Sequence, residues 1–173
     1  LTKINHVSGK LSQPMIQIGT QDLGEAIFEE AEFHSNYVEE SILELKETVG
    51  SLIFRSNQFY DDVVQSFNEY ITIHSLYKMI FTNTTFTNIG DDETNDRRTQ
   101  LILINAVNLA EEGDFLMNSV IVTNCSLSFF TLSNVRNSAS VTKIIRFENL
   151  TVRDTTYGGY NDVILFGPMF TNE

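Results

Sequence analysis

The chain repeats one eight-residue pattern, and this repetition constrains the fold more than any other feature. The pattern is apolar at positions one, three and eight and carries Asn or another polar residue at position five. It occurs at Met79–Phe86, Val120–Leu127 and Ile145–Val152, and more loosely at Leu52–Phe59 and Ala26–Phe33, where Ser56 and Glu30 take position five. Such repeats are supersecondary units that bury their apolar face only by stacking on neighbours.

A second kind of apolar segment precedes the copies of this pattern. These segments are short and rich in β-branched and aromatic residues, as strands are. They are Met15–Gly19, Ser41–Leu45, Ile71–Ser75, Leu101–Asn105, Phe129–Ser133 and Val163–Gly167. One landmark in each, at Ile18, Leu45, Ile73, Leu103, Leu132 and Leu165, gives steps of 27, 28, 30, 29 and 33 residues. Two strands in each repeat of this length predict the coils of a parallel β-solenoid.

Alternation along the strands predicts which side chains fill the interior of the solenoid. The positions two and four residues before the Asn position are expected to point inward. This predicts an interior column of Phe28, Phe54, Phe81 and Phe147, in which Val122 is the exception. Beyond the corner, the expected inward residues are Phe33, Phe59, Phe86, Leu127 and Val152.

Two stretches depart from the regular spacing. Asn83 and Asn124 lie 41 residues apart, and the polar stretch Ile89–Gln100 between them predicts a loop inserted into one repeat. Upstream, Asn36–Thr48 carries apolar residues at helical spacing, which is typical of an amphipathic helix. We favour a strand there, because Leu45 falls on the repeat landmark.

Composition limits the classes of partner. The net charge of −12 argues against nucleic acid or an anionic membrane, since both need a basic face. No apolar run reaches the roughly 20 residues of a membrane-spanning helix.

Cys125 is the single cysteine, so it forms no internal disulfide, and it is expected to pack inward as a small apolar residue. The chain begins without Met and stops just after an apolar strand, so we expect a fragment of a longer protein or a mature piece.

The repeats resemble those of a known group. L-I-L-I-N paired with V-I-V-T-N-C-S-L, and F-F-T-L-S-N paired with I-R-F-E-N-L-T-V, are similar to right-handed parallel β-helix repeats of the pectin-lyase-like kind. More narrowly, they resemble the degenerate repeats of large cell-surface proteins of protists and bacteria. The resemblance covers Ser51 to Phe170, whereas the first fifty residues match it poorly. The repeat spacing predicts an all-β parallel β-helix (a β-solenoid) over residues 1–173, with about six coils of roughly 25–30 residues, and the resemblance implies that its winding is right-handed.

The sequence departs from the enzymes of that superfamily, whose catalytic faces carry acidic, Arg or Lys clusters on consecutive coils. Here the charged pairs at 61–62, 91–92 and 153–154 do not share one register. We therefore expect a non-enzymatic structural or adhesive segment of a large extracellular or cell-surface protein, with no cofactor. Its partners would be neighbouring coils or subunits of a surface assembly, and glycans. The alternatives are a polysaccharide-active lyase or hydrolase on the same scaffold, or an intracellular filament scaffold.

Asn83, Asn124 and Asn149 each begin an N-x-S/T sequence and allow two readings. In the first, alternation turns their side chains into the corner, where the amides form a buried asparagine ladder. Asn also tolerates the left-handed backbone that a tight corner requires. In the second, they are N-glycosylation sites of an extracellular glycoprotein. A buried ladder residue cannot carry a glycan, so the two readings exclude each other at any one site.

No other residues show the spacing of a metal or catalytic site. The acidic clusters at 61–62, 91–96 and 111–114 lack the ligand spacing of a calcium loop and are typical of solvated loops. The histidines lie in different repeats, with no Cys or carboxylate at ligand spacing. They are His6, His34 and His74.

Overall fold

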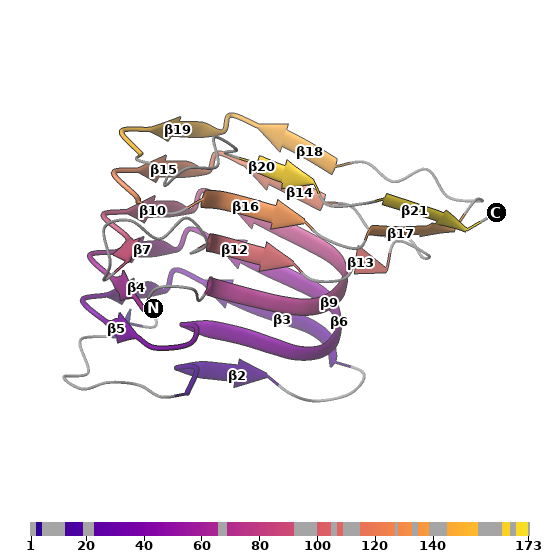
Figure 1. The fold of residues 1–173 in the computed structure, drawn as a ribbon, viewed down its shortest axis with the longest axis horizontal. Coiled ribbons are helices and arrows are strands. Elements are labelled where there is room, and N and C mark those ends of the chain that lie inside the picture. Colours follow the sequence, from indigo (N-terminus) through magenta and orange to yellow (C-terminus); the bar gives the residue numbers. More distant parts are fainter. Residues whose placement is uncertain are drawn as a thin grey trace.

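A computed structural model confirms that the chain is an all-β parallel solenoid (Figure 1). It describes residues 3–4, 13–18, 23–65, 69–91, 100–104, 107–108, 115–126, 128–132, 135–138, 145–155, 164–166 and 169–172. All strand pairs in the described part of the chain are parallel. The competing helix at Asn36–Thr48 is absent, because this stretch contains β5 (Tyr37–Val38) and the first part of β6 (Leu43–Arg55).

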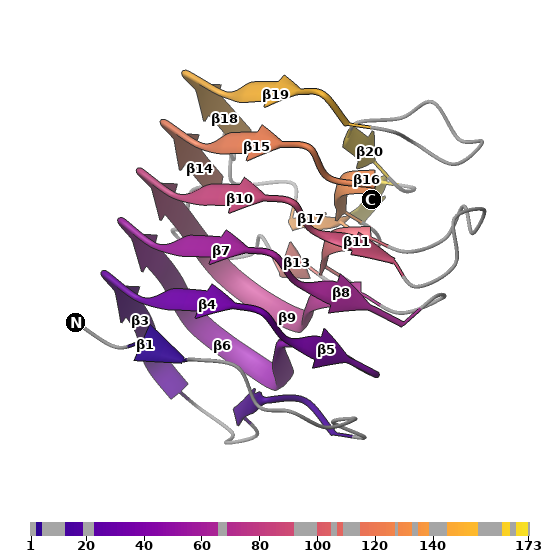
Figure 2. The same cartoon turned by 90° about the vertical axis from the view of Figure 1, so that its left-hand side faces the viewer.

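The strands form three sheets that wrap one core (Figure 2). The six-stranded sheet contains β1 (Lys3–Ile4), β4 (Glu32–His34), β7 (Gln58–Tyr60), β10 (Thr85–Thr87), β15 (Ile121–Thr123) and β19 (Thr151–Arg153). The three-stranded sheet contains β5 (Tyr37–Val38), β8 (Val63–Val64) and β11 (Gly90–Asp91). The twelve-stranded sheet contains β2 (Ile16–Ile18), β3 (Leu23–Glu29), β6 (Leu43–Arg55), β9 (Glu69–Thr82), β12 (Gln100–Ile104), β13 (Val107–Asn108), β14 (Phe115–Asn118), β16 (Ser128–Leu132), β17 (Val135–Ser138), β18 (Ile145–Glu148), β20 (Ile164–Phe166) and β21 (Met169–Asn172).

A complete turn consists of three strands rather than the two predicted for each repeat: one long bent strand is followed by two short strands. The long strands β6 and β9 lie directly on each other, and the curved ribbons in Figure 1 show both. Each leads into a short strand of the six-stranded sheet and then into one of the three-stranded sheet. Within the described part of the chain, three turns contain strands of all three sheets, against the six coils predicted. No described helix is long and apolar enough to cross a membrane.

The strand register corrects the alignment of one predicted repeat. Met79 pairs with Phe115, and Phe115 pairs with Ile145, so the turn above Met79–Phe86 is Phe115–Val122. The predicted copy at Val120–Leu127 is therefore five residues out of phase. The sequence was ambiguous because F-T-N occurs at both corners of one turn, at residues 81–83 and again at 86–88.

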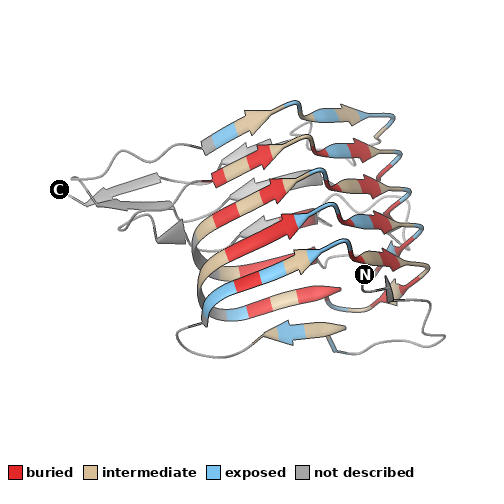
Figure 3. Ribbon diagram, turned by 180° about the vertical axis from the view of Figure 1, so that it is seen from behind, coloured by how far each residue is buried: buried red, intermediate tan, exposed pale blue. Residues whose placement is uncertain are grey.

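The corrected register completes two interior columns. The first is Phe28, Phe54, Phe81, Met117 and Phe147. The second is Phe33, Phe59, Phe86, Val122 and Val152. The predicted phenylalanine column is confirmed, but Met117 occupies the level assigned to Val122. The predicted inward residue Leu127 lies outside the described residues. Figure 3 shows the resulting alternation of buried and more exposed bands along the strands.

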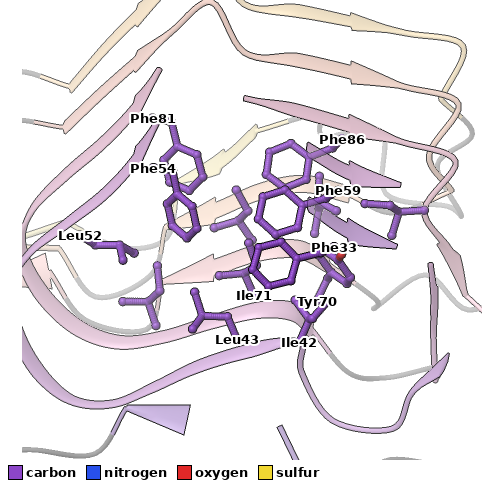
Figure 4. Close-up of a cluster of buried hydrophobic side chains, with 14 of the residues drawn as sticks. Phe33, Ile42, Leu43, Leu52, Phe54, Phe59, Tyr70, Ile71, Phe81 and Phe86 are labelled. Atoms are coloured by element: carbon purple, nitrogen blue, oxygen red, sulfur yellow. The ribbon is translucent and has the colours of Figure 1, made fainter. Parts of the chain in front are cut away.

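Aromatic rings in each column stack at nearly the spacing of the strands. Ring centroids are 4.5 Å apart for Phe54 and Phe81 and 4.8 Å apart for Phe59 and Phe86, and the rings are nearly parallel. Hydrogen-bonded strands lie about 4.8 Å apart, so ring stacking and the backbone ladder fit one register. The two columns also contact each other edge to face, with the ring centroids of Phe54 and Phe59 6.0 Å apart (Figure 4).

The short apolar segments found in the sequence are strands, with two small corrections. Ile73 pairs with Ile104, and Leu132 pairs with Phe166. The residues equivalent to the other landmarks are therefore 104 and 166, one residue after the predicted 103 and 165. The predicted insertion Ile89–Gln100 is narrower than expected, because Ile89 is buried, the next two residues form β11, and Gln100 begins β12. Residues 92–99 lie outside the described residues.

We predict that the Phe81→Ala substitution lowers the free energy of unfolding by about 3–5 kcal/mol, because it opens a cavity in a stacked column. Chemical denaturation followed by circular dichroism measures this change. Ile121→Ala is the matched control, because this residue lies on the outer side of a strand and is 39% exposed. The control should cost less than about 1 kcal/mol. Equal effects of the two substitutions would contradict the inward assignment of Phe81.

Candidate functional site

Two columns of left-handed residues mark the corners of the solenoid. The first corner column is Glu30, Ser56, Asn83, Ser119 and Asn149, with φ between 50° and 55°. The second corner column is Ser35, Asp61, Asn88, Asn124 and Asp154, with φ between 51° and 57°. Asp61 and Asp154 thus share one column, which corrects the expectation that their charged pairs lie out of register. Short polar side chains that bond locally tolerate this conformation better than others, which explains the abundance of Asn and Asp here. Figure 2 shows the first corners stacked along one side of the molecule.

The three predicted asparagines point outward, so the reading that places them in a buried ladder is wrong. Asn83, Asn124 and Asn149 are all exposed. A left-handed residue resets the two-residue alternation: Phe81 points inward, Thr82 and Asn83 do not, and Thr84 points inward again. Moreover, Asn124 belongs to the second corner column, whereas the other two belong to the first.

The corner backbone keeps its hydrogen bonds, so it needs no buried amide at the Asn position to satisfy it. The N–H group of Ser56 donates to the Thr82 carbonyl at 2.9 Å. The N–H group of Asn83 likewise donates to the Asn118 carbonyl at 3.1 Å. The parallel ladder therefore continues through the left-handed residue.

Asn57 is the buried corner amide, one residue beyond the predicted position. Its Oδ1 accepts the N–H of Ala31 at 2.9 Å, and its Nδ2 donates to the Phe28 carbonyl at 2.9 Å. Asn57 is fully buried and ties its own turn to the turn below. The corresponding residue in the next turn is Thr84, which is also buried and donates to the Thr82 carbonyl at 3.1 Å. This role of Asn57 was not predicted from the sequence, although Asn57 directly follows Ser56, which takes the Asn position of its repeat.

An amide ladder does exist, but it lies on the outside of the second corner. Asn124 Nδ2 donates to Asn88 Oδ1 at 2.7 Å, and Asn88 Nδ2 donates to Asp61 Oδ1 at 2.8 Å. We call these three residues the outer ladder. It joins three successive turns through exposed side chains, and only one of its members was among the predicted asparagines.

The outer ladder borders an open pocket of about 370 Å³. The residues that line it are Asp61, Asp62, Val63, Asn88, Ile89, Gly90, Asn124, Cys125 and Ser126. Asp62 is the buried carboxyl group of this pocket. Its Oδ1 accepts the backbone N–H of Asn36 at 2.7 Å and the side-chain Nδ2 of Asn36 at 2.9 Å. Its Oδ2 accepts the hydroxyl of the fully buried Tyr70.

Burial dominates the electrostatics of this carboxyl group. Burial raises the pKa of Asp62 above its ordinary 3.8, and the hydrogen bonds from Tyr70 and Asn36 oppose that increase. Burial and the adjacent Asp62 carboxylate together raise the pKa of Tyr70 well above its ordinary value. Asn36 Oδ1 is buried and has no hydrogen-bond partner among the described residues. Both Asp62 oxygens are thus engaged by groups that hold adjacent turns together.

The remaining predicted residues do not assemble into one site. Cys125 is buried as predicted, its thiol lies 3.4 Å from the Thr123 carbonyl, and burial raises its pKa. His34 lies in the six-stranded sheet and stacks on Tyr60, with ring centroids 4.8 Å apart. His74 lies in the twelve-stranded sheet, where its Nε2 is 3.3 Å from a carboxylate oxygen of Glu44. His6 and the acidic residues at 92–96 and 111–114 lie outside the described residues. Within the described ranges, no group of three His, Cys, Asp or Glu residues could hold a metal ion.

We predict a specific pH dependence for Asp62. Because its pKa is higher in the folded state, the folded protein binds a proton more tightly than the unfolded chain. The contribution of Asp62 to the free energy of unfolding is therefore greatest below about pH 3.8, and it falls as the pH rises through the folded pKa. The Asp62→Asn variant should lack this fall, as measured by denaturant titrations between pH 3 and 8.

Tyr70→Phe supplies the matched comparison. It removes a hydrogen bond that lowers the pKa of Asp62, so the fall in stability should extend to higher pH than in the parent. Parallel stability–pH curves for the parent and the Asp62→Asn variant would contradict the assignment.

Comparison with protein-family models, with curated proteins and with solved structures finds no match to this chain.

Proposed function

We propose that this chain is a non-enzymatic structural or adhesive β-solenoid segment of a large extracellular or cell-surface protein. The observation that carries the proposal is the engagement of buried polar groups between turns. Asn57 and Asp62 each bond to the turn below, and Asp62 also bonds to Tyr70 at the start of β9. These contacts favour a fixed stacking register, which suits a rigid spacer.

The dimensions also suit a rigid spacer. Six strands stack in one sheet, and five steps of about 4.8 Å give a length of about 24 Å for this segment. Solenoids of this kind present long sides for contacts, because each coil touches only its neighbours and their outer residues form continuous columns. The parallel winding supports the further proposal that the chain is related to pectin-lyase-like β-helices.

The rival function is a polysaccharide-active lyase or hydrolase. Glycoside hydrolases require two carboxyl groups that are available to substrate across one cleft. In the pocket at the second corner, Asp62 is buried with both oxygens accepting hydrogen bonds. The neighbouring Asp61 accepts from Asn88 at 2.8 Å. Because these hydrogen bonds occupy the carboxylate oxygens, they favour the structural role over the catalytic one.

An antibody against the purified chain tests the proposed location. On intact, non-permeabilised cells of the organism that makes the protein, we expect surface labelling that disappears after external protease treatment. Detergent-permeabilised cells serve as the control for total protein. Labelling that appears only after permeabilisation would overturn the extracellular assignment and favour the intracellular filament scaffold.

A second assay separates the structural role from the enzyme. The purified chain, incubated with pectins and other acidic and neutral polysaccharides, should release neither unsaturated uronic-acid ends nor reducing ends. Product formation that the Asp61→Asn and Asp62→Asn variants both lose would establish the enzymatic alternative instead.

A further inference from the structure

We propose that the first corner of the solenoid is an N-glycosylation ridge carrying glycans at Asn83 and Asn149, whereas Asn124 stays unmodified within the outer ladder. The inference rests on the proposed extracellular function, because the modification takes place in the secretory pathway. It assigns the two readings of the N-x-S/T sequences to different corners. The amide ladder runs along the second corner, and the glycan acceptors lie along the first.

The surroundings of Asn83 and Asn149 leave room for a glycan. Both residues are exposed, and their neighbours in the first corner column, Ser56 and Ser119, have short side chains. The Asn83 side chain has no hydrogen-bond partner among the residues that the structure describes. Asn149 Nδ2 donates to Asn118 Oδ1 at 3.3 Å, beyond the usual range of about 2.7–3.2 Å. A glycan at either position would therefore disrupt little of the fold.

The surroundings of Asn124 are different. Its Nδ2, the atom that a glycan would modify, donates at 2.7 Å to Asn88, which in turn bonds to Asp61. Asn124 also lines the pocket of the second corner, and the next residue, Cys125, is packed in the core. A sugar on Nδ2 would leave one N–H for the ladder and would occupy the mouth of that pocket. The folded state therefore disfavours modification here.

The reaction balances with one co-reactant, a lipid pyrophosphate-linked oligosaccharide. A bond forms between Nδ2 of Asn83 or Asn149 and C1 of the first sugar. The bond between C1 and the phosphate oxygen breaks, and its electron pair leaves with the lipid pyrophosphate. The amide nitrogen gives up one proton to a base of the transferase. No oxidant or reductant is needed.

The ridge also specifies which side of the solenoid is covered. Asn83 and Asn149 lie two strand levels apart in the first corner column, which corresponds to about 10 Å. Two glycans at this spacing would cover the first corner along β9, β14 and β18. The second corner, with its outer ladder and pocket, would remain open to protein partners.

The test directs the full chain into the secretory pathway of a eukaryotic host behind a cleavable signal peptide. Total protein, both secreted and retained, is treated with peptide N-glycosidase in heavy-oxygen water, and mass spectrometry locates the labelled residues. We expect label at Asn83 and Asn149 in most molecules and little or none at Asn124. Asn83→Gln and Asn149→Gln should each remove one gel-mobility step, whereas Asn124→Gln should remove none.

Control substitutions at the third position of each N-x-S/T sequence remove the hydroxyl residue that the transferase recognises and leave the acceptor asparagine in place. Thr85→Ala and Thr151→Ala preserve the asparagines and should also abolish each step, and Ser126→Ala should change nothing. Strong label at Asn124, or no label at Asn83 and Asn149, would overturn the inference whether or not the chain is secreted. Label at both sites in the host, with none in protein from its natural source, would overturn the inference for the protein in its own cells, whereas the surface-labelling experiment decides the proposed extracellular function separately.

Discussion

The structure depends on the stacking of like side chains at the spacing of its strands. Ring centroids of Phe54 and Phe81 are 4.5 Å apart, close to the strand spacing of about 4.8 Å. One register therefore satisfies both the backbone hydrogen bonds and the aromatic contacts. A shift of one residue would move these rings to the outer face and expose a large apolar area, which makes the register strongly specified.

The left-handed corner residues divide polar side chains into two classes with different roles. Side chains at the left-handed position, such as Asn83 and Asn124, face solvent, whereas those one residue later, such as Asn57 and Asp62, are buried. The buried class connects successive turns, and the exposed class can meet partners or receive modifications. The structural role and the glycosylated ridge that we propose both follow from this division.

Alternation and repeat spacing predicted the solenoid, the strand positions and the Phe28–Phe54–Phe81 column, because these depend on the two-residue period of each strand and on the recurrence of one pattern in successive turns. The phase of the copy at Val120–Leu127 could not be predicted, because F-T-N marks both corners of a turn. The orientation of Asn83 depends on a left-handed φ of 50°, which simple alternation ignores. The Asp62–Tyr70 contact joins neighbouring turns through side chains, and no repeat pattern in the sequence indicates it.

The central claim is that each corner turns its left-handed residue outward and the next residue inward. Free energies of unfolding of Asn57→Ala and Asn83→Gly, measured by denaturant titration, test it most directly. Asn57→Ala should cost about 1–3 kcal/mol, because the buried Ala31 N–H loses its side-chain partner and the Phe28 carbonyl loses one hydrogen bond. Asn83→Gly should change stability by less than about 0.5 kcal/mol, because it removes an exposed side chain at a left-handed residue. A large loss for Asn83→Gly together with a negligible one for Asn57→Ala would contradict the account.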